Sequence, residues 1–219
     1  MATAAATADS KGFIKYIFVR SYVAVSYVTD KFDDRVVELL RDGAVGLLPS
    51  DTIYGLSCRA LDKAAVERIH KLKGRDSNKP LIVLIADTKM LDLLSISGNQ
   101  AKQVEPYWPG AISLEFQAPS SPHWLHRGFK HFAIRVPDYP ELRDLIRQVG
   151  PIVSTSANLQ GQQPVASVAA AQEFFGDKLD FYVDVGELDN PPSTLAILEN
   201  GRLKTVRQGA VKIEDRSNL

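Results

Sequence analysis

The sequence predicts an α/β fold with a mixed sheet, and two patterns support this prediction. From residue 30 to residue 156, segments with the spacing of amphipathic helices alternate with short, continuously apolar segments typical of buried strands. Near the C-terminal end, strand-like segments follow one another without a helix between them, which a purely parallel sheet does not produce. With 219 residues the chain can bury a full hydrophobic core, and one domain is the simplest division.

Aspartates introduce the first two predicted helices. Asp30 is expected to cap the helix that stops at Gly43, and Asp62 to cap the next one, because a carboxylate at this position accepts free backbone N–H groups. The apolar faces of these helices are Val36, Val37, Leu39 and Leu40 in the first, and Ala65, Val66, Ile69 and Leu72 in the second. Strands are predicted at 13–28, 44–49 and 80–86.

The second half of the chain continues the alternation and then changes to strands. Short helices are predicted at 88–94 and just before Trp108, a longer helix is expected to begin at Asp138, and a further helix spans 165–175. The predicted strands are 112–118, 131–136, 151–156 with a polar turn at its end, 181–186, 193–199 and 202–207.

The composition predicts a folded domain without a broad nucleic-acid surface. The 26 basic residues are balanced by 26 acidic residues, which argues against a basic face that binds nucleic acid by counterion release. The single cysteine, Cys58, excludes an internal disulfide and a multi-cysteine zinc site, and this fits the cytoplasm. Residues 1–12 are predicted to be a disordered lead-in, 13–212 the folded domain and 213–219 a C-terminal tail.

Ligand-binding residues are expected in the turns at strand ends, where open α/β sheets commonly place ligands. The first such turn, at 49–56, reads PSDTIYGL and offers hydroxyls, a carboxylate and a glycine that permits close approach to the backbone. The alternative is that Asp51 and Thr52 form only a local turn and that Tyr54 packs in the core.

Four cations, Lys71, Lys73, Arg75 and Lys79, gather where the second predicted helix ends. A solvated structural cap is one interpretation, because cations favour a helix C-terminus. The other is a phosphate site, in which the ammonium of Lys73 and the planar fork of Arg75 converge on a polyphosphate. The chain contains neither a GxxxxGK[ST] loop nor a GxGxxG fingerprint, so phosphates would depend on such side-chain cations.

Three further positions follow predicted strands. The sequence STSAN at 154–158 can bind a nucleotide through neutral hydrogen bonds or can simply form a capping turn. Arg135 and Arg207 each leave an apolar strand, and each is either paired structurally or available to an anion.

The histidines predict no metal site, because no two of them form an H-x-x-x-H pair on a helix. His123 and His126 lie in a segment rich in proline and serine, 119–128, which is predicted to be a surface or lid loop.

In their order along the chain, these segments resemble the YrdC-like threonylcarbamoyl-AMP synthase family in its short single-domain form, from about Asp30 to Gly209. The matching motifs are PSDTIYGL at 49–56, K-x-R at 73–75 before a proline-led strand, W-P-G at 108–110, S-x-N at 156–158, S-T at 193–194 and R-x-G at 207–209. Any one motif can arise by chance, whereas six in order, each at the end of a predicted element, are specific.

The resemblance implies a twisted open mixed sheet, flanked by helices, around a deep electropositive cavity that holds ATP and L-threonine. It implies that the threonine amine captures bicarbonate or carbon dioxide as a carbamate, which attacks the α-phosphate of ATP in the presence of Mg²⁺. The products are threonylcarbamoyl-AMP and pyrophosphate, so the enzyme is expected to be a nucleotidyltransferase. The adenylate supplies tRNA threonylcarbamoyladenosine modification in the cytoplasm through transfer proteins, with direct tRNA binding weak or absent and no membrane association.

The resemblance also implies residue roles, and Lys73 and Arg75 are the expected catalytic residues. The implied ATP-binding residues are Lys73, Arg75, Lys79, Ser156, Asn158 and Arg207. The implied threonine-binding residues are Thr52, Arg135, Ser154 and Ser193, with Arg135 paired with the substrate carboxylate.

Departures from the family pattern concern three positions. Ser50 and Ser113 replace the usual threonines but keep a hydroxyl, whereas Leu84 stands where longer members carry a histidine near the substrate. The extra C-terminal domain of longer members has no counterpart in the sequence. Two related functions remain as alternatives: an RNA-binding relative, which lacks K-x-R, and a carbamoyl-transfer relative, which carries zinc-finger and acylphosphatase-like extensions.

Overall fold

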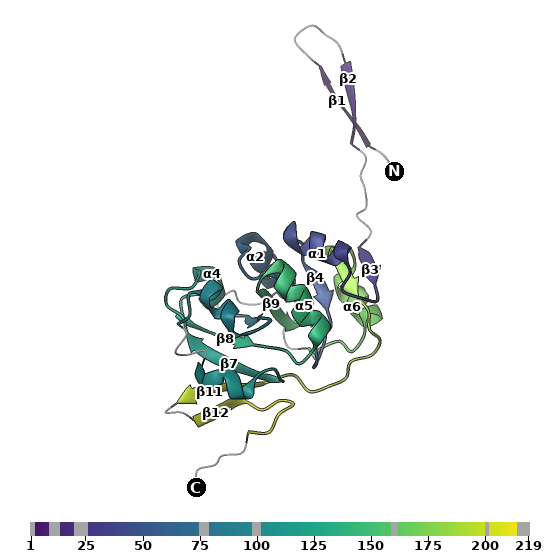
Figure 1. The fold of residues 1–219 in the computed structure, drawn as a ribbon. Coiled ribbons are helices and arrows are strands. Elements are labelled where there is room, and N and C mark those ends of the chain that lie inside the picture. The colour runs from purple at the N-terminus through teal and green to yellow at the C-terminus, as the bar shows by residue number, and fades with distance from the viewer. Residues whose placement is uncertain are drawn as a thin grey trace.

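The structure is a computed structural model that describes residues 3–8, 14–19, 26–74, 79–97, 102–158, 162–199 and 202–213. A ten-stranded sheet organises the fold, in the order β12-β11-β7-β8-β6-β9-β5-β4-β10-β3 (Figure 1). Its strands are β3 (Tyr27–Thr29), β4 (Gly46–Leu48), β5 (Gly55–Arg59), β6 (Ile82–Leu84), β7 (Ile112–Gln117), β8 (His131–Arg135), β9 (Ile152–Ser156), β10 (Phe181–Val183), β11 (Thr194–Glu199) and β12 (Arg202–Arg207).

Both strand directions occur in this sheet. The pairs β3/β10, β4/β10, β6/β8 and β7/β11 are parallel, and the other neighbouring pairs are antiparallel. β3 and β12 lie at the two edges, so the sheet is open. The predicted α/β fold with an open mixed sheet is confirmed.

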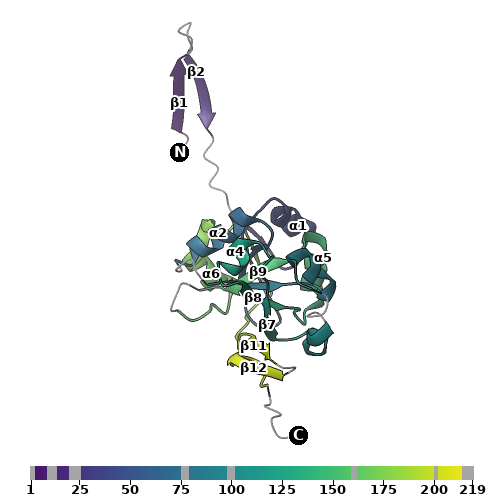
Figure 2. The same cartoon turned by 90° about the vertical axis from the view of Figure 1, so that its left-hand side faces the viewer.

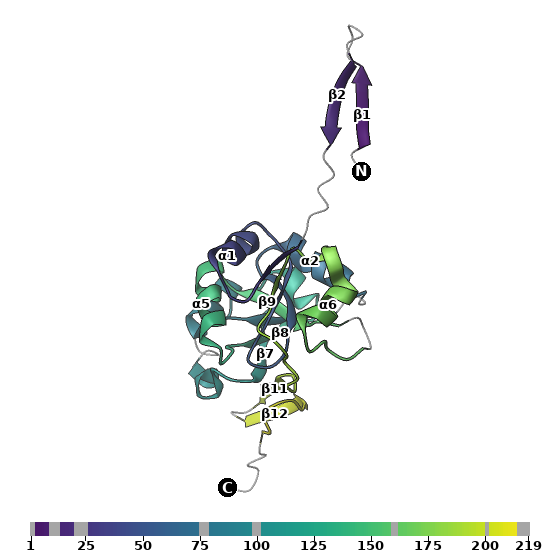
Figure 3. The same ribbon diagram turned by 90° about the vertical axis from the view of Figure 1, so that its right-hand side faces the viewer.

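Helices cover the sheet on both faces. They are α1 (Asp34–Arg41), α2 (Lys63–Leu72), α4 (His123–His126), α5 (Pro140–Val149), α6 (Val168–Phe175) and the 3-10 helices η1 (Thr88–Leu94), η2 (Glu105–Tyr107) and η3 (Gly176–Lys178). Figures 2 and 3 show α1 and α5 on one side of the strands and α2 and α6 on the other. None of the helices in the described part of the chain has the length and apolar character needed to cross a membrane.

Two groups of buried side chains reflect these two layers. The alternation along each strand sends successive side chains to opposite faces. Leu48, Leu84 and Ile152 therefore pack with the apolar faces of α1 and α5, whereas their sheet neighbours Leu47 and Val83 belong to the core on the α2 side. The face that α1 and α5 cover in part is also the face that forms the floor of the site described below.

Capping in the structure agrees with one sequence prediction and corrects another. Asp62 caps α2, and its side chain accepts from the backbone N–H of Ala65 at 3.0 Å, as predicted. The prediction of Asp30 as the first cap is wrong, because Asp33 caps α1. The second carboxylate oxygen of Asp33 accepts from the hydroxyls of Tyr27 and Thr29, on β3, which the helical pattern alone does not reveal.

Two further elements differ from the predictions, and one strand agrees with them. α5 begins at Pro140, with Tyr139 rather than Asp138 at the N-cap, because proline suits the first turn of a helix. The segment 119–128 contains α4, whose Leu125 and His126 are buried, and Trp124 donates from Nε1 to the backbone oxygen of Ala60 at 3.0 Å, so the segment packs on the body as a short helix. The strand predicted at 151–156 is confirmed as β9, which β5 pairs with along its whole length.

The N-terminal part contains two further strands, β1 (Thr3–Ala8) and β2 (Ile14–Val19), which pair antiparallel in a separate sheet. β1 falls within the predicted lead-in 1–12. The division into 1–12, 13–212 and 213–219 stays a prediction.

Candidate active site

A cavity of about 340 Å³ lies over the central strands. Its lining unites residues that the sequence motifs place far apart in the chain. Among them are six residues with predicted substrate roles: Thr52, Arg135, Ser154, Ser156, Ser193 and Arg207.

The register of the sheet explains why these side chains meet. Ile82 lies opposite Ser154 on β9, and Leu84 lies opposite Arg135 on β8. Because side chains alternate along a strand, Ile82, Leu84, Arg135 and Ser154 share one face of the sheet. This face forms the cavity floor, and the turns before β5 and β11 form its walls.

Two side chains of the turn at 49–56 hold the guanidinium group of Arg135. Its side chain is buried, one terminal nitrogen is paired with the carboxylate of Asp51, and the other donates to Thr52 Oγ1 at 3.2 Å. The other carboxylate oxygen of Asp51 accepts from the backbone N–H of Asp138 at 3.1 Å. Burial lowers the pKa of Arg135 from its ordinary value, and the neighbouring Asp51 opposes that shift. The ion pair therefore keeps a cation in a desolvated position.

The turn itself is built by Ser50 rather than by Asp51. Ser50 Oγ accepts from the backbone N–H groups of Thr52 and Ile53, both at 3.2 Å, and donates to the Ile53 carbonyl at 2.8 Å. Tyr54 is fully buried and donates to the carbonyl of Gly186 at 2.7 Å. The core position expected as one alternative for Tyr54 is therefore correct, whereas Asp51 makes a long-range contact instead of a local turn.

Lys73 connects the end of α2 to the S-x-N motif. Its buried Nζ donates to the Ser156 carbonyl at 2.5 Å and to Asn158 Oδ1 at 2.8 Å. Ser156 Oγ also donates to Asn158 Oδ1, at 2.7 Å. A helix-terminal cation and the predicted nucleotide-binding residues thus form one hydrogen-bonded unit. Ser156 of this unit lines the cavity, whereas Lys73 and Asn158 are not among the lining residues.

Two other cations were predicted to bind ATP together with Lys73. Lys79 is exposed and, like Lys73, is not among the residues that line the cavity, and its predicted role in ATP binding stays a prediction. Arg75 lies outside the described residues.

The S-T and R-x-G motifs pack against each other at the opposite wall. Arg207 donates from Nη2 to the Ser193 carbonyl at 2.9 Å, and the backbone N–H of Gly209 donates to Thr194 Oγ1 at 3.0 Å. Ser193 Oγ and Ser113 Oγ lie 2.8 Å apart, so Ser113 supports the hydroxyl that is predicted to contact threonine.

Gly209→Ala is expected to disrupt the packing of the R-x-G motif against the segment that contains Ser193. A Cβ at position 209 would lie 2.2 Å from the backbone oxygen of Pro192 and 2.5 Å from the carbonyl carbon of Ser193, a clash that only a backbone shift can relieve. We expect a loss of about 1–3 kcal/mol in the free energy of unfolding, as for other overpacked sites, together with reduced activity. Denaturant unfolding measures the first effect. Gly110→Ala, whose Cβ would meet only the Tyr107 oxygen at 3.4 Å, is the control and should cost less.

Local patterns missed one contact and two polar side chains of this site. The sequence pattern included Asp51 in its turn but not the contact with Arg135, which lies 84 positions away. Glu115 on β7 and His131 on β8 both line the cavity, and Glu115 Oε2 lies 3.2 Å from His131 Nδ1. The period-2 pattern of two adjacent strands is the signal that could have placed these two residues on one face.

The site is suited to binding and orienting reactants rather than to covalent catalysis by a nucleophilic side chain. Cys58 is buried on the α2 side, and burial raises the pKa of its thiol well above the ordinary value, which disfavours a reactive thiolate. Within the described ranges, no group of three or more His, Cys, Asp or Glu side chains could hold a metal ion. The cavity instead offers hydroxyls and two arginines, which suit carboxylate and phosphate groups.

Several known proteins are similar to this chain. A protein-family model named for the Sua5, YciO and YrdC proteins, and described as telomere recombination, matches residues 38–209. The threonylcarbamoyl-AMP synthase of Pseudoalteromonas translucida is 36% identical over 175 residues, covering 76% of this chain and 93% of the relative. The threonylcarbamoyl-AMP synthase of Chromobacterium violaceum is 35% identical over 178 residues, covering 79% of this chain and 92% of the relative.

Several solved structures are also similar to this chain. P. abyssi Sua5 in complex with L-threonine matches with a TM-score of 0.74 at 28% identity, covering 84% of this chain; the chain spans 57% of that protein. E. coli YciO matches with a TM-score of 0.73 at 23% identity, covering 86% of this chain and 96% of that one, and shows likeness of fold. HypF, at 18% identity and a TM-score of 0.70, likewise shares the fold over 80% of this chain and 28% of its own.

Proposed function

The chain belongs to the Sua5/YciO/YrdC family, and from this membership we propose that it is an L-threonylcarbamoyladenylate synthase. It converts ATP, L-threonine and bicarbonate into threonylcarbamoyl-AMP, pyrophosphate and water, the water being released when the threonine amine and bicarbonate form the carbamate. The observation that carries the proposal is the shared cavity, whose lining includes six residues to which the sequence resemblance assigns substrate contacts. The curated relatives at 35–36% identity, which have the name of this activity, support it.

Threonine occupies the part of the cavity around Arg135 in this proposal. A guanidinium fork can hold the substrate carboxylate, and the hydroxyls of Thr52, Ser154 and Ser193 surround the rest of the small molecule. Leu84 also lines the cavity and offers an apolar surface to the substrate methyl group.

ATP occupies the part of the cavity around the S-x-N motif and Arg207. In this proposal Lys73, which contacts the cavity-lining Ser156 and also Asn158, neutralises phosphate charge, and Arg75 and Lys79 complete this set. A carbamate oxygen attacks the α-phosphorus, and the bond from that phosphorus to the pyrophosphate oxygen breaks. Since no protein nucleophile is required, the enzyme contributes alignment of the reactants and neutralisation of charge.

Several finer features belong to the same proposal. The enzyme is a nucleotidyltransferase, and Mg²⁺ enters with ATP, held mainly by phosphate oxygens, because the described lining includes few carboxylates. The adenylate is passed in the cytoplasm to proteins that modify tRNA, and direct tRNA binding is weak or absent because the chain has no net charge.

Reconstitution tests the proposed reaction. Protein, ATP, Mg²⁺, bicarbonate and threonine are mixed, and threonylcarbamoyl-adenylate is detected by mass spectrometry together with pyrophosphate. We expect product only when all substrates are present, and loss of product in Lys73→Ala and Arg75→Ala. ATP binding without product would favour the carbamoyl-transfer or RNA-binding alternatives instead.

Selectivity for threonine over serine is expected to be incomplete. The two substrates differ by one methyl group, and one methyl in a pocket discriminates by only about 1–3 kcal/mol, or roughly 10–200-fold. The ratio of kcat/KM for the two amino acids measures this selectivity. A much larger ratio would contradict discrimination by the methyl pocket alone.

A further inference from the structure

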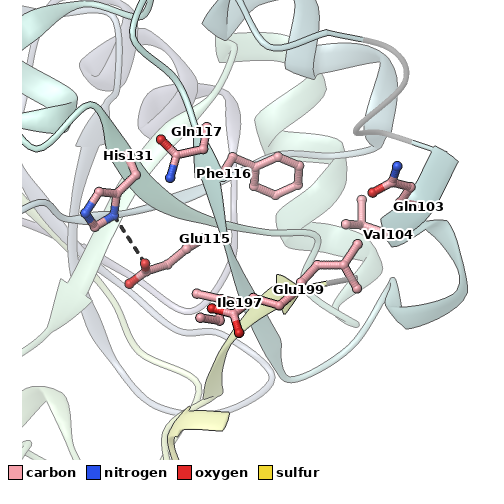
Figure 4. Close-up of a pocket in the computed structure, with 9 residues that line it drawn as sticks. Gln103, Val104, Glu115, Phe116, Gln117, His131, Ile197 and Glu199 are labelled. Atoms are coloured by element: carbon pink, nitrogen blue, oxygen red, sulfur yellow. Dashed lines mark ion pairs between the residues drawn. The ribbon is translucent and has the colours of Figure 1, made fainter. Parts of the chain in front are cut away.

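Glu115 and His131 form a polar pair at one end of the cavity floor. Figure 4 shows the ring of His131 directed toward the carboxylate of Glu115, with Nδ1 and Oε2 3.2 Å apart. Both residues line the cavity of the candidate active site, called the main cavity below, and both also line a second cavity of about 260 Å³. The pair therefore stands at the boundary between the two spaces.

The second cavity lies where the sheet divides. The ladder between β7 and β11 ends at the pair Glu115 and Ile197, although both strands continue. Beyond this point β7 remains paired with β8, and β11 remains paired with β12. Glu115 is consequently the last side chain of β7 in this ladder, at the edge of the main cavity.

Glu115 is the single carboxylate among the described residues that line the main cavity. The nearby Asp51 is already occupied, because its two oxygens accept from Arg135 and from the Asp138 backbone N–H. A cationic group on a ligand in this cavity would therefore find its anionic partner at Glu115. In the pair with His131, only Oε2 is engaged, so Oε1 is not used by that contact.

Glu115 and Arg135 are close enough in the sheet register for both side chains to reach one small ligand. Glu115 lies opposite Ala133, two positions before Arg135 on the same face of the sheet, which makes Glu115 and Arg135 diagonal neighbours. Diagonal neighbours are about 7–8 Å apart, within joint reach of long side chains and a small ligand placed between them. Arg135 is buried, and its Nε has no hydrogen-bond partner among the described residues.

We propose that Glu115 binds the ammonium group of the amino-acid substrate while Arg135 binds its carboxylate. This inference rests on the proposed function and adds the residue that recognises the amine. His131 is a positioning residue, which holds the carboxylate of Glu115 toward the cavity through the contact at Nδ1. The site thus recognises the zwitterion by two opposite charges on adjacent strands.

Binding of two related ligands tests the assignment. The dissociation constants of L-threonine and of 3-hydroxybutyrate, which is threonine without its amine, are measured by calorimetry or ligand-observed NMR for the wild type and for Glu115→Gln. A hydrogen bond to a charged group is worth enough that we expect the threonine constant to rise about tenfold or more, whereas that of 3-hydroxybutyrate stays within about twofold. Glu115→Asp keeps the charge and should lose less affinity than Glu115→Gln.

Glu199→Gln is the matched control. Glu199 lines only the second of the two cavities, and its Oε2 lies 3.6 Å from Lys204 Nζ. Because Glu199 does not line the cavity that is proposed to bind threonine, its substitution should leave threonine affinity unchanged. Equal threonine affinity in the wild type and Glu115→Gln, or an equal loss for both ligands, would overturn the inference. A wild-type protein that binds no threonine and forms no adenylate would instead contradict the proposed function itself.

Discussion

Lys73→Ala is expected to lower kcat/KM for adenylate formation by about 10²–10³-fold, the range seen when one preorganised donor to a developing anion is removed. The ammonium group lies 2.5 Å from the Ser156 carbonyl and 2.8 Å from Asn158 Oδ1, and the side chain is buried. The cation is therefore in position before ATP binds, so the phosphates meet a charge that needs little reorganisation. Release of pyrophosphate at varied ATP concentration measures the effect.

The same contacts give Lys73 a structural role, which needs a separate readout. If Lys73 acts on phosphates, Lys73→Ala should weaken the binding of ATP far more than the binding of adenosine. An equal loss for both ligands would mean that the substitution only disorders the turn at Ser156 and Asn158. Lys71→Ala is the matched control, because Lys71 is an exposed lysine on the last turn of the same helix.

Elements with local determinants were predictable from the sequence. α2 has its cap, Asp62, and its apolar face within one short segment, and both appear in the structure as predicted. α1 has the same pattern with three nearby aspartates, and the choice of Asp33 depends on hydroxyls from Tyr27 and Thr29 in a neighbouring strand. Propensity alone ranks such candidates equally, and tertiary contacts decide between them.

Part of the cavity lining was predictable from the sequence, but the contacts of these residues were not. The predicted residues Thr52, Arg135 and Ser193 line the cavity, whereas Lys73 and Asn158 do not, and their substrate roles stay predictions. The pairing of Arg135 with Asp51 joins the end of β8 to a turn 84 positions earlier in the chain, and the pairing of Glu115 with His131 requires the register of β7 against β8. Register is fixed by the packing of the whole sheet, so a single segment does not contain this information.

The buried ion pair between Asp51 and Arg135 leads to the largest expected effect on stability. Arg135→Ala should lower the free energy of unfolding by about 3–5 kcal/mol, because removing one partner leaves the other charge buried without compensation. Asp51→Ala should have a similar cost for the same reason. The side chains are 4% and 13% exposed for Arg135 and Asp51, so solvent screens this pair little. Denaturant unfolding of the single variants measures both losses.

The double variant Asp51→Ala/Arg135→Ala separates the structural role of Arg135 from its role in binding. With both charges removed, no uncompensated ion remains, so the double variant should be more stable than the sum of the two single losses predicts. Threonine affinity should nevertheless stay about 100-fold or more below that of the wild type, because a bidentate, charge-assisted contact to the substrate carboxylate is missing. Recovery of threonine binding along with stability would mean that Arg135 serves only to hold Asp51 and the turn at 49–56, and that another cation receives the carboxylate.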